Sequence, residues 1–136
     1  MTTVNVLAAA LLVPLAVAVA KPPPAYVVTA TGKHRLGYSS YCWTTKQRSV
    51  CADFAAPHCR GTAAAPVVRV HRGERVRFEL GFTPKSVSLS VAGGPAHDLT
   101  PTRHPAWRAT RAGPLSLFAD AKTNGDASYT ACIVFR

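Results

Sequence analysis

The sequence predicts an all-β protein, an antiparallel sandwich of about seven or eight short strands preceded by a helical signal peptide. Apolar and polar side chains alternate with period two along several segments between residues 26 and 135. Glycine and proline residues separate these segments at short intervals, and the chain after residue 20 shows no apolar repeat of 3.6 residues. Many short strands with turns between them are typical of a sandwich or a barrel.

The first twenty residues have the pattern of a secretory signal. The fifteen residues from Val6 to Ala20 carry no charge, which suits the apolar core of a signal peptide and falls short of the roughly 20 residues that span a bilayer. Ala18 and Ala20 flank Val19, and small residues at this spacing predict cleavage after Ala20. Because residues 1–5 contain no Lys or Arg, an uncleaved anchor and a start codon further upstream stay open as alternatives.

The chain after the signal is expected to form one domain. Cleavage after Ala20 would leave 116 of the 136 residues, enough for a single modest core. Residues 21–25 read Lys-Pro-Pro-Pro-Ala and predict an extended, loosely held lead, because proline has no amide hydrogen to donate to a helix or a sheet. Residues 26–136 are then the β-sandwich domain, and this mature chain has no segment expected to span a membrane.

The first half of the domain predicts a hairpin that follows an edge strand. The expected elements, in chain order, are an edge strand at 26–31, a turn at 32–35, a strand at 36–43, a polar connection at 44–49, a strand at 50–54 and an irregular segment at 55–66. Aromatic and β-branched residues favour the strands, whereas prolines and a glycine interrupt the irregular segment.

The clearest alternation lies between residues 68 and 91. The apolar residues that share one face are Val68, Val70, Val76, Phe78, Leu80, Phe82, Val87, Leu89 and Val91. Charged residues and serines occupy the positions between them, and Gly73-Glu74 and Pro84-Lys85 mark turns. The pattern predicts a half-buried meander, with its apolar face toward the core.

The last third of the chain predicts a long loop followed by short strands. Gly93-Gly94-Pro95 ends the alternation, and residues 96–105 read as a loop. Short strands are expected at 107–109 and 115–118. After the Asn124-Gly125 turn comes a final strand, whose core-facing residues are expected to be Tyr129, Ala131, Ile133 and Phe135.

Four cysteines follow the signal, and an even number in a small exported domain predicts two disulfides. No C-x-x-C spacing is present, so a zinc site is not favoured. Three pairings are formally possible. We prefer Cys42–Cys51, which would close the hairpin, together with Cys59–Cys132, which would tie the middle of the chain to its last strand. The main alternative pairs Cys42 with Cys132 across two sheets.

Two stretches resemble known patterns. Residues 65–78 resemble the paired strands of immunoglobulin-like and cupredoxin-like sandwiches. Ser40-Tyr41-Cys42-Trp43 together with Cys51-Ala52-Asp53 is similar to an element of small, uncharacterised bacterial secreted and lipoprotein-like sequences. These resemblances imply an immunoglobulin-like β-sandwich and a secreted, extracytoplasmic protein, and they carry no activity to transfer.

The residues exclude or disfavour several kinds of chemistry. A blue-copper centre needs a His shortly after its Cys, but Cys132 is followed only by Ile-Val-Phe-Arg. The six carboxylates are scattered, and neither G-x-S-x-G nor H-E-x-x-H occurs. We therefore expect no enzyme activity and no cofactor. A weaker alternative is a small metal-handling protein that uses His97, Asp98 and His104 on one loop.

The formal net charge of +10 is the strongest pointer to a partner. Arg69, Arg75 and Arg77 are expected on two neighbouring strands, with Arg72 at the turn between them, so that four guanidinium groups would form one anion-binding patch. The leading hypothesis is an exported, non-enzymatic module that binds an anionic cell-envelope polymer or another surface protein. Nucleic acid is not expected, because the chain is exported and no aromatic residue is interleaved with these arginines.

Overall fold

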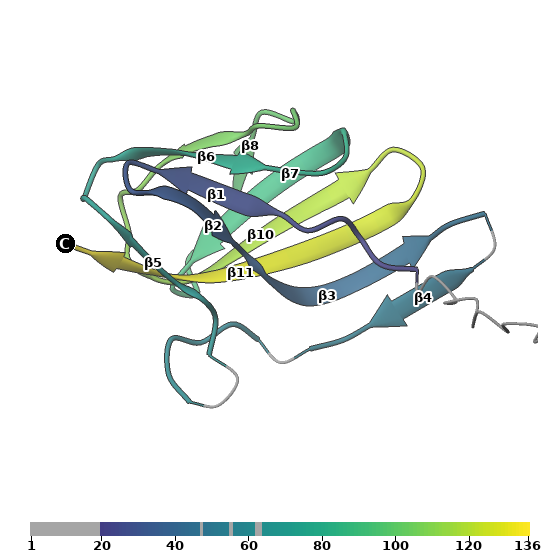
Figure 1. Cartoon of the computed structure of the whole chain (residues 1–136), viewed down its shortest axis with the longest axis horizontal. Coiled ribbons are helices and arrows are strands. Elements are labelled where there is room, and N and C mark those ends of the chain that lie inside the picture. The colour runs from purple at the N-terminus through teal and green to yellow at the C-terminus, as the bar shows by residue number, and fades with distance from the viewer. Residues whose placement is uncertain (1–19, 47, 55, 62–63) are drawn as a thin grey trace, which may run out of the picture.

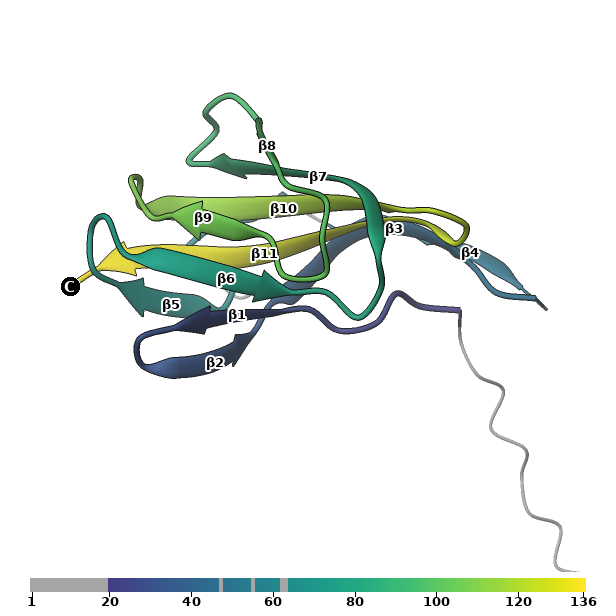
Figure 2. The ribbon, with the colours of Figure 1, turned by 90° about the horizontal axis from the view of Figure 1, so that it is seen from above.

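Two β-sheets packed face to face make up the structure (Figures 1 and 2). This computed structural model describes residues 20–46, 48–54, 56–61 and 64–136. All regular secondary structure within these ranges is β, in eleven strands. The predicted fold class, an all-β sandwich, is therefore confirmed at this level.

The two sheets differ in size. The small sheet has the strand order β2-β1-β6-β9, with bounds β1 Tyr26–Thr29, β2 Gly32–Arg35, β6 Arg75–Glu79 and β9 Ala106–Arg108. The large sheet has the order β4-β3-β11-β10-β7-β8, with bounds β3 Gly37–Thr44, β4 Ser49–Ala52, β7 Pro84–Val91, β8 His97–Leu99, β10 Gly113–Ala121 and β11 Gly125–Phe135. A seventh strand of the large sheet, β5 (Val67–Val70), pairs in parallel with the C-terminal half of β11.

The core lies between the sheets and follows the predicted alternation. Val76 and Phe78 of the small sheet are about 1% exposed, and Leu89, Leu117 and Tyr129 of the large sheet face them with exposures of 0–1%. Burying a Val, Leu or Phe side chain of this kind stabilises a fold by roughly 1.5–3 kcal/mol. The period-two pattern therefore identified the buried side of these strands correctly.

The predicted meander is wrong, because its three strands, β5, β6 and β7, do not pair with one another. β5 pairs with β11, β6 pairs with β1 and β9, and β7 pairs with β10 and β8. The turn at Gly73-Glu74 carries the chain from the large sheet to the small one, and residues 80–83 carry it back. Alternation specifies which side of a strand is buried but not which strand lies beside it, so the pairing was not determined by the pattern.

Two short strands account for part of the difference from the predicted seven or eight. Residues 32–35, expected to be a turn, form β2 beside β1. Residues 97–99, expected to be loop, form β8 beside β7. Both are edge strands of three or four residues, too short to show a convincing alternation of their own.

The proline-rich segment before β1 is part of the folded domain. Pro22 is fully buried, and its carbonyl oxygen accepts a hydrogen bond of 2.7 Å from the Tyr38 hydroxyl. The Pro23 carbonyl accepts one of 2.8 Å from the Tyr129 hydroxyl. The expectation of a loosely held lead is therefore wrong. A proline needs a partner only for its carbonyl, and two core tyrosines provide those partners.

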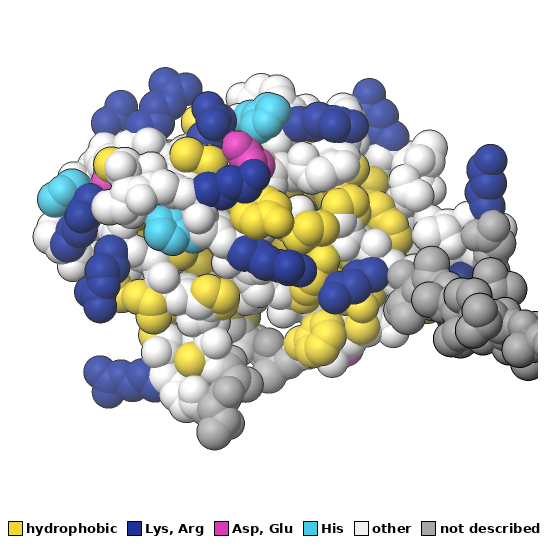
Figure 3. Space-filling model, in the orientation of Figure 1, with side chains coloured by type: hydrophobic (Ala, Val, Ile, Leu, Met, Phe, Trp, Pro, Cys, Tyr) yellow, Lys and Arg dark blue, Asp and Glu magenta, His cyan; other side chains and the backbone are white. Residues whose placement is uncertain are grey.

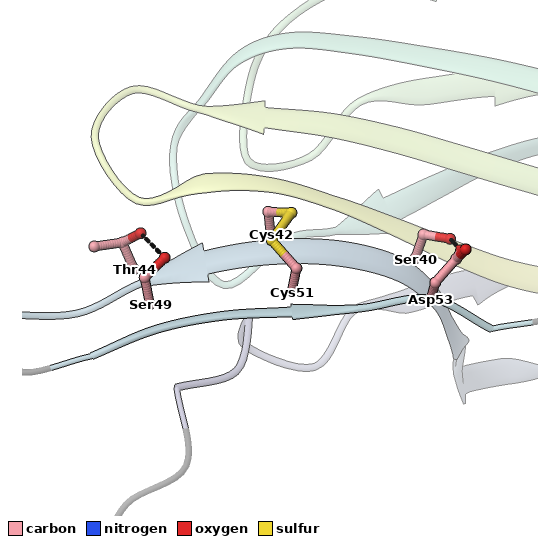
Figure 4. Close-up of a disulfide and its surroundings, with 6 residues drawn as sticks. All are labelled: Ser40, Cys42, Thr44, Ser49, Cys51 and Asp53. Atoms are coloured by element: carbon pink, nitrogen blue, oxygen red, sulfur yellow. Dashed lines mark hydrogen bonds between the residues drawn. A yellow bond between two sulfur atoms is a disulfide. The ribbon is translucent and has the colours of Figure 1, made fainter.

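Both disulfides have the preferred pairing. Cys42–Cys51 joins residues directly opposite one another on β3 and β4 (Figure 4). Hydrogen bonds flank it on the same face, Thr44 Oγ1 to Ser49 Oγ at 3.0 Å and Ser40 Oγ to Asp53 Oδ1 at 2.6 Å. Cys59–Cys132 ties the irregular segment before β5 to the outward side of β11.

Two disulfides are typical of extracytoplasmic proteins. The described ranges contain no helix long and apolar enough to cross a membrane. The predicted signal peptide falls almost wholly on residues 1–19, outside the described residues.

Candidate anion-binding surface

The outward side of the small sheet carries a row of residues set by strand register. From β2 to β9 the row consists of Lys33, Val28, Arg77 and Ala106, one residue from each strand. Each of them lies directly opposite the next. The inward neighbours Val27 and Phe78 are buried, so this row faces solvent.

Further pairings continue this outward side on both sides of the row. Arg35 lies opposite Tyr26, which lies opposite Glu79, and Arg75 lies opposite Arg108. We call the five cations the basic face: Lys33, Arg35, Arg75, Arg77 and Arg108. All five are exposed, and Glu79 is the one acid that the register places among them.

The structure keeps only part of the predicted arginine patch together. Arg75 and Arg77 lie two residues apart on β6 and point outward, as expected. Arg69 lies on β5, which belongs to the large sheet, so the interpretation that it neighbours Arg75 is wrong. Arg72 lies in the turn, and its guanidinium sits 4.6 Å from the centre of the Phe135 ring. The cause is the crossing between sheets at Gly73-Glu74.

Sequence reasoning missed three members of the basic face. Lys33 and Arg35 lie in a predicted turn, because a stretch of four residues is too short to show the alternation of a strand. Arg108 belongs to a predicted strand that had not been assigned to either sheet. Their proximity depends on the pairing of β1 with β2 and β6, and of β6 with β9, which spans up to about fifty residues of sequence.

Glu79 forms ion pairs with two members of the basic face. Its Oε2 lies 2.8 Å from Lys33 Nζ and its Oε1 lies 3.5 Å from Arg77 Nη2. The Lys33 hydrogen bond holds the pKa of Glu79 below its usual value, and the same bond raises the pKa of Lys33. Both groups therefore stay charged at neutral pH. Five cations and one carboxylate leave this face with a formal charge of +4.

Glu74 fixes the turn at one end of the basic face. Its two carboxylate oxygens accept hydrogen bonds from the backbone amides of Ala30, at 3.0 Å, and His71, at 3.1 Å. The Ala30 bond is the main reason that the pKa of Glu74 lies below its usual value. The carboxylate thus joins the β1–β2 turn to the turn that precedes β6, which bears Arg75.

A hollow lies along β9 and the first residue of β6. It has a volume of about 220 Å³ and is lined by Arg75, Ala106, Trp107 and Arg108. A second hollow of about 270 Å³ lies beside the Cys42–Cys51 disulfide, where Asp53 and Asp126 contribute to its lining. Carboxylates repel an anion, so of these two hollows the first suits an anionic ligand.

The outward sides of β10 and β11 differ in charge from the basic face. The outward residues of β10 and β11, in the described chain, include Asp120 and Asp126 and no Lys or Arg. In Figure 3, dark-blue Lys and Arg side chains far outnumber magenta Asp and Glu over the region of β1, β2 and β6. The outward side of the small sheet therefore carries a local excess of positive charge that the outward sides of β10 and β11 lack.

The metal hypothesis gains no support from the geometry. His97 and Asp98 are consecutive residues of β8 and pair with Leu89 and Ser88, so they point to opposite sides of the strand. His104 lies in the following loop, close enough to Glu79 to lower the pKa of that carboxyl. Across the described ranges, no three His, Cys, Asp or Glu side chains come together as metal ligands would.

Comparison with known proteins gives no relative. No protein-family model, no curated protein sequence and no solved structure matches the chain.

Proposed function

We propose that this protein is an exported, non-enzymatic module that binds an anionic polymer of the cell envelope through the basic face. The observation that carries the proposal is the register of the small sheet, which places five cations on one solvent-exposed side with a single carboxylate among them.

Arginine and a flat sheet suit such a partner. A guanidinium group donates two parallel hydrogen bonds to a carboxylate or a phosphate and stays charged at any physiological pH. Four of the five cations of the basic face are arginines. An extended array of cations across a four-stranded sheet matches a polymer with repeated charges better than it matches a small ligand, which needs an enclosing pocket.

The compartment belongs to the same proposal. The apolar run from Val6 to Ala20 and the A-x-A pattern support secretion with cleavage after Ala20. The two disulfides fit an oxidising compartment. Envelope polymers that carry phosphate or carboxylate groups are the anions that such a protein meets, whereas nucleic acid is scarce there. A surface protein with an acidic patch is the alternative partner.

The immunoglobulin-like type of sandwich is also part of the proposal. Two face-packed sheets of mainly antiparallel strands support it. Neither disulfide is the central inter-sheet bridge of antibody domains, since Cys42–Cys51 lies within the β3–β4 hairpin and Cys59 precedes β5. We therefore limit the likeness to general architecture.

A charge-removal series tests the proposal. The triple variant R35Q/R75Q/R77Q removes three cations from the basic face, and R69Q/K85Q/K122Q removes three exposed cations that lie on strands or turns of the large sheet. At low salt we expect the first variant to bind polyphosphate or polygalacturonate about 100-fold more weakly, since each cation near an anionic surface contributes about 1 kcal/mol.

The control variant has the same net charge, so it separates a located surface from a general attraction. We expect it to lose less than about threefold in affinity. Equal losses for the two variants, or affinities that do not change with salt concentration, would contradict the proposal.

A further inference from the structure

Arg75 and Arg108 face each other without a carboxylate partner. They are direct partners across the β6–β9 pair, and like charges opposite one another in an antiparallel pair destabilise a sheet. The ion pairs in the described part of the chain join Glu79 to Lys33 and Arg77, and leave these two arginines unpaired. A bound anion would turn this repulsion into attraction.

The guanidinium group of Arg108 is held in position by the adjoining turn. Its Nη1 donates to the Gly73 carbonyl at 2.8 Å. The Gly73 amide donates to the Ala109 carbonyl at 2.7 Å, and the Ala109 amide donates to the Glu74 carbonyl at 2.8 Å. A guanidinium has five N–H donors, so most of those on Arg108 stay available for a ligand, and little side-chain freedom is lost when it binds.

The hollow beside this pair has room for more than water. Its volume of about 220 Å³ compares with roughly 30 Å³ for one water molecule in the liquid. The two arginines supply the donors, while Ala106 and the partly exposed Trp107 supply apolar lining. Such a site suits a charged group together with the carbon atoms that bear it.

The geometry points to a tetrahedral oxyanion, a phosphate or sulfate ester group of the polymer, as the ligand of the Arg75–Arg108 pair; this inference rests on the proposed function. A carboxylate has two oxygens in one plane, and the fork of one guanidinium engages both of them. The oxygens of a phosphate or sulfate point in several directions. Two guanidinium groups that approach from neighbouring strands can therefore each engage some of them.

Titration with small probes tests this inference. Inorganic phosphate, sulfate and acetate are added to the full protein, and the Nε–Hε signals of the arginines are followed by NMR. We expect saturable shifts at Arg75 and Arg108 with phosphate and sulfate, and an affinity about tenfold lower for acetate, which corresponds to the loss of one charge-assisted hydrogen bond. Equal affinity for acetate would overturn the inference.

Conservative variants separate geometry from charge. R75K/R108K keeps both charges but removes both guanidinium forks, and we expect phosphate binding to weaken about tenfold or more. The matched control R69K lies on β5 of the large sheet, outside the basic face, and should leave phosphate binding unchanged. Thermal unfolding verifies that each variant is folded. Unchanged phosphate affinity in folded R75K/R108K would contradict the assignment.

These outcomes are distinct from those that test the proposed function. If R35Q/R75Q/R77Q abolishes polymer binding while phosphate and acetate bind alike, the polymer surface stands and the tetrahedral site fails. If phosphate saturates the arginine pair while no polyanion binds selectively, the site stands and the polymer proposal fails.

Discussion

At the scale of single residues, two tyrosine hydroxyls join the segment before β1 to the core. Tyr129 is fully buried between the sheets and donates to the Pro23 carbonyl, and Tyr38 donates to the Pro22 carbonyl. The rings of these tyrosines are tilted neighbours, with centroids 5.6 Å apart. The prolines therefore occupy a defined place in the sandwich, although their sequence has the composition of a linker.

Removal of the Tyr129 hydroxyl should weaken this attachment. We expect Y129F to lower the free energy of unfolding by about 1 kcal/mol, because the Pro23 carbonyl loses its partner. Tyr41 provides the control: it is buried, and within the described residues its hydroxyl makes no hydrogen bond to protein. Urea unfolding of Y129F and Y41F measures the difference, and an equal effect of the two substitutions would contradict the role given to the hydroxyl.

Glu74 makes the stability of the protein depend on pH. Its pKa is lower in the folded chain than its ordinary value of 4.5, chiefly because of the Ala30 amide. A carboxyl with a lowered folded pKa stabilises the fold above its unfolded pKa, and this stabilisation is lost as the pH falls through the folded pKa.

The variant E74Q should therefore be less stable than the wild type at neutral pH, by about 1 kcal/mol, and the gap should close as the pH falls below 4.5. Chemical denaturation at a series of pH values measures the gap. A difference between the two proteins that stays constant down to pH 3 would show that the charge of Glu74 is not its source.

At the scale of elements, the β3–β4 hairpin depends on an exposed disulfide at the edge of the large sheet. Cys42 and Cys51 are both exposed, whereas Cys132 is only 3% exposed. β4 pairs with β3 alone. Cys42–Cys51 closes a short loop with a sequence separation of 9, and Cys59–Cys132 closes a long one with a separation of 73.

Mild reduction should therefore open Cys42–Cys51 first, because a thiol reagent reaches exposed sulfur atoms more easily. Alkylation followed by peptide mass spectrometry identifies the opened bridge. Earlier alkylation of Cys59 and Cys132 would contradict the account.

The two bridges should also differ in their effect on stability. In a chain-entropy model, loss of the short bridge costs about 3 kcal/mol and loss of the long one about 4 kcal/mol. The double mutant C42S/C51S should therefore be more stable than C59S/C132S.

The sequence predicts the buried sides of these strands better than their neighbours. Val76 and Phe78 are buried because period-two alternation is a local property. Arg69 was predicted beside Arg75, but the chain changes sheets at Gly73-Glu74, and a turn can lead to a paired strand or to the opposite sheet. For the same reason, the sequence does not place Lys33 and Arg108 beside the other members of the basic face. Which distant strands pair depends on how the whole core packs.

At the scale of the whole molecule, the small sheet presents a cluster of five cations on its outer side. The basic face lies on the outer side of the small sheet, and Asp120 and Asp126 lie on the outer side of the large one. Net charge alone, +10 for the chain, predicts attraction to any polyanion but no particular orientation. The position of the basic face adds an orientation to our proposal: a bound polymer would lie against the small sheet, and the disulfide hairpin lies at an edge of the other sheet.

The most direct test of this account is a map of the residues that a polyanion contacts. Backbone amide NMR signals of the protein are recorded while polyphosphate is added at low salt. We predict that the largest shifts fall on β1, β2, β6 and β9, around Lys33, Arg35, Arg75, Arg77 and Arg108, and that they disappear as salt is raised. Shifts centred on β10 and β11, or spread evenly over both sheets, would contradict the claim that the small sheet carries the binding surface.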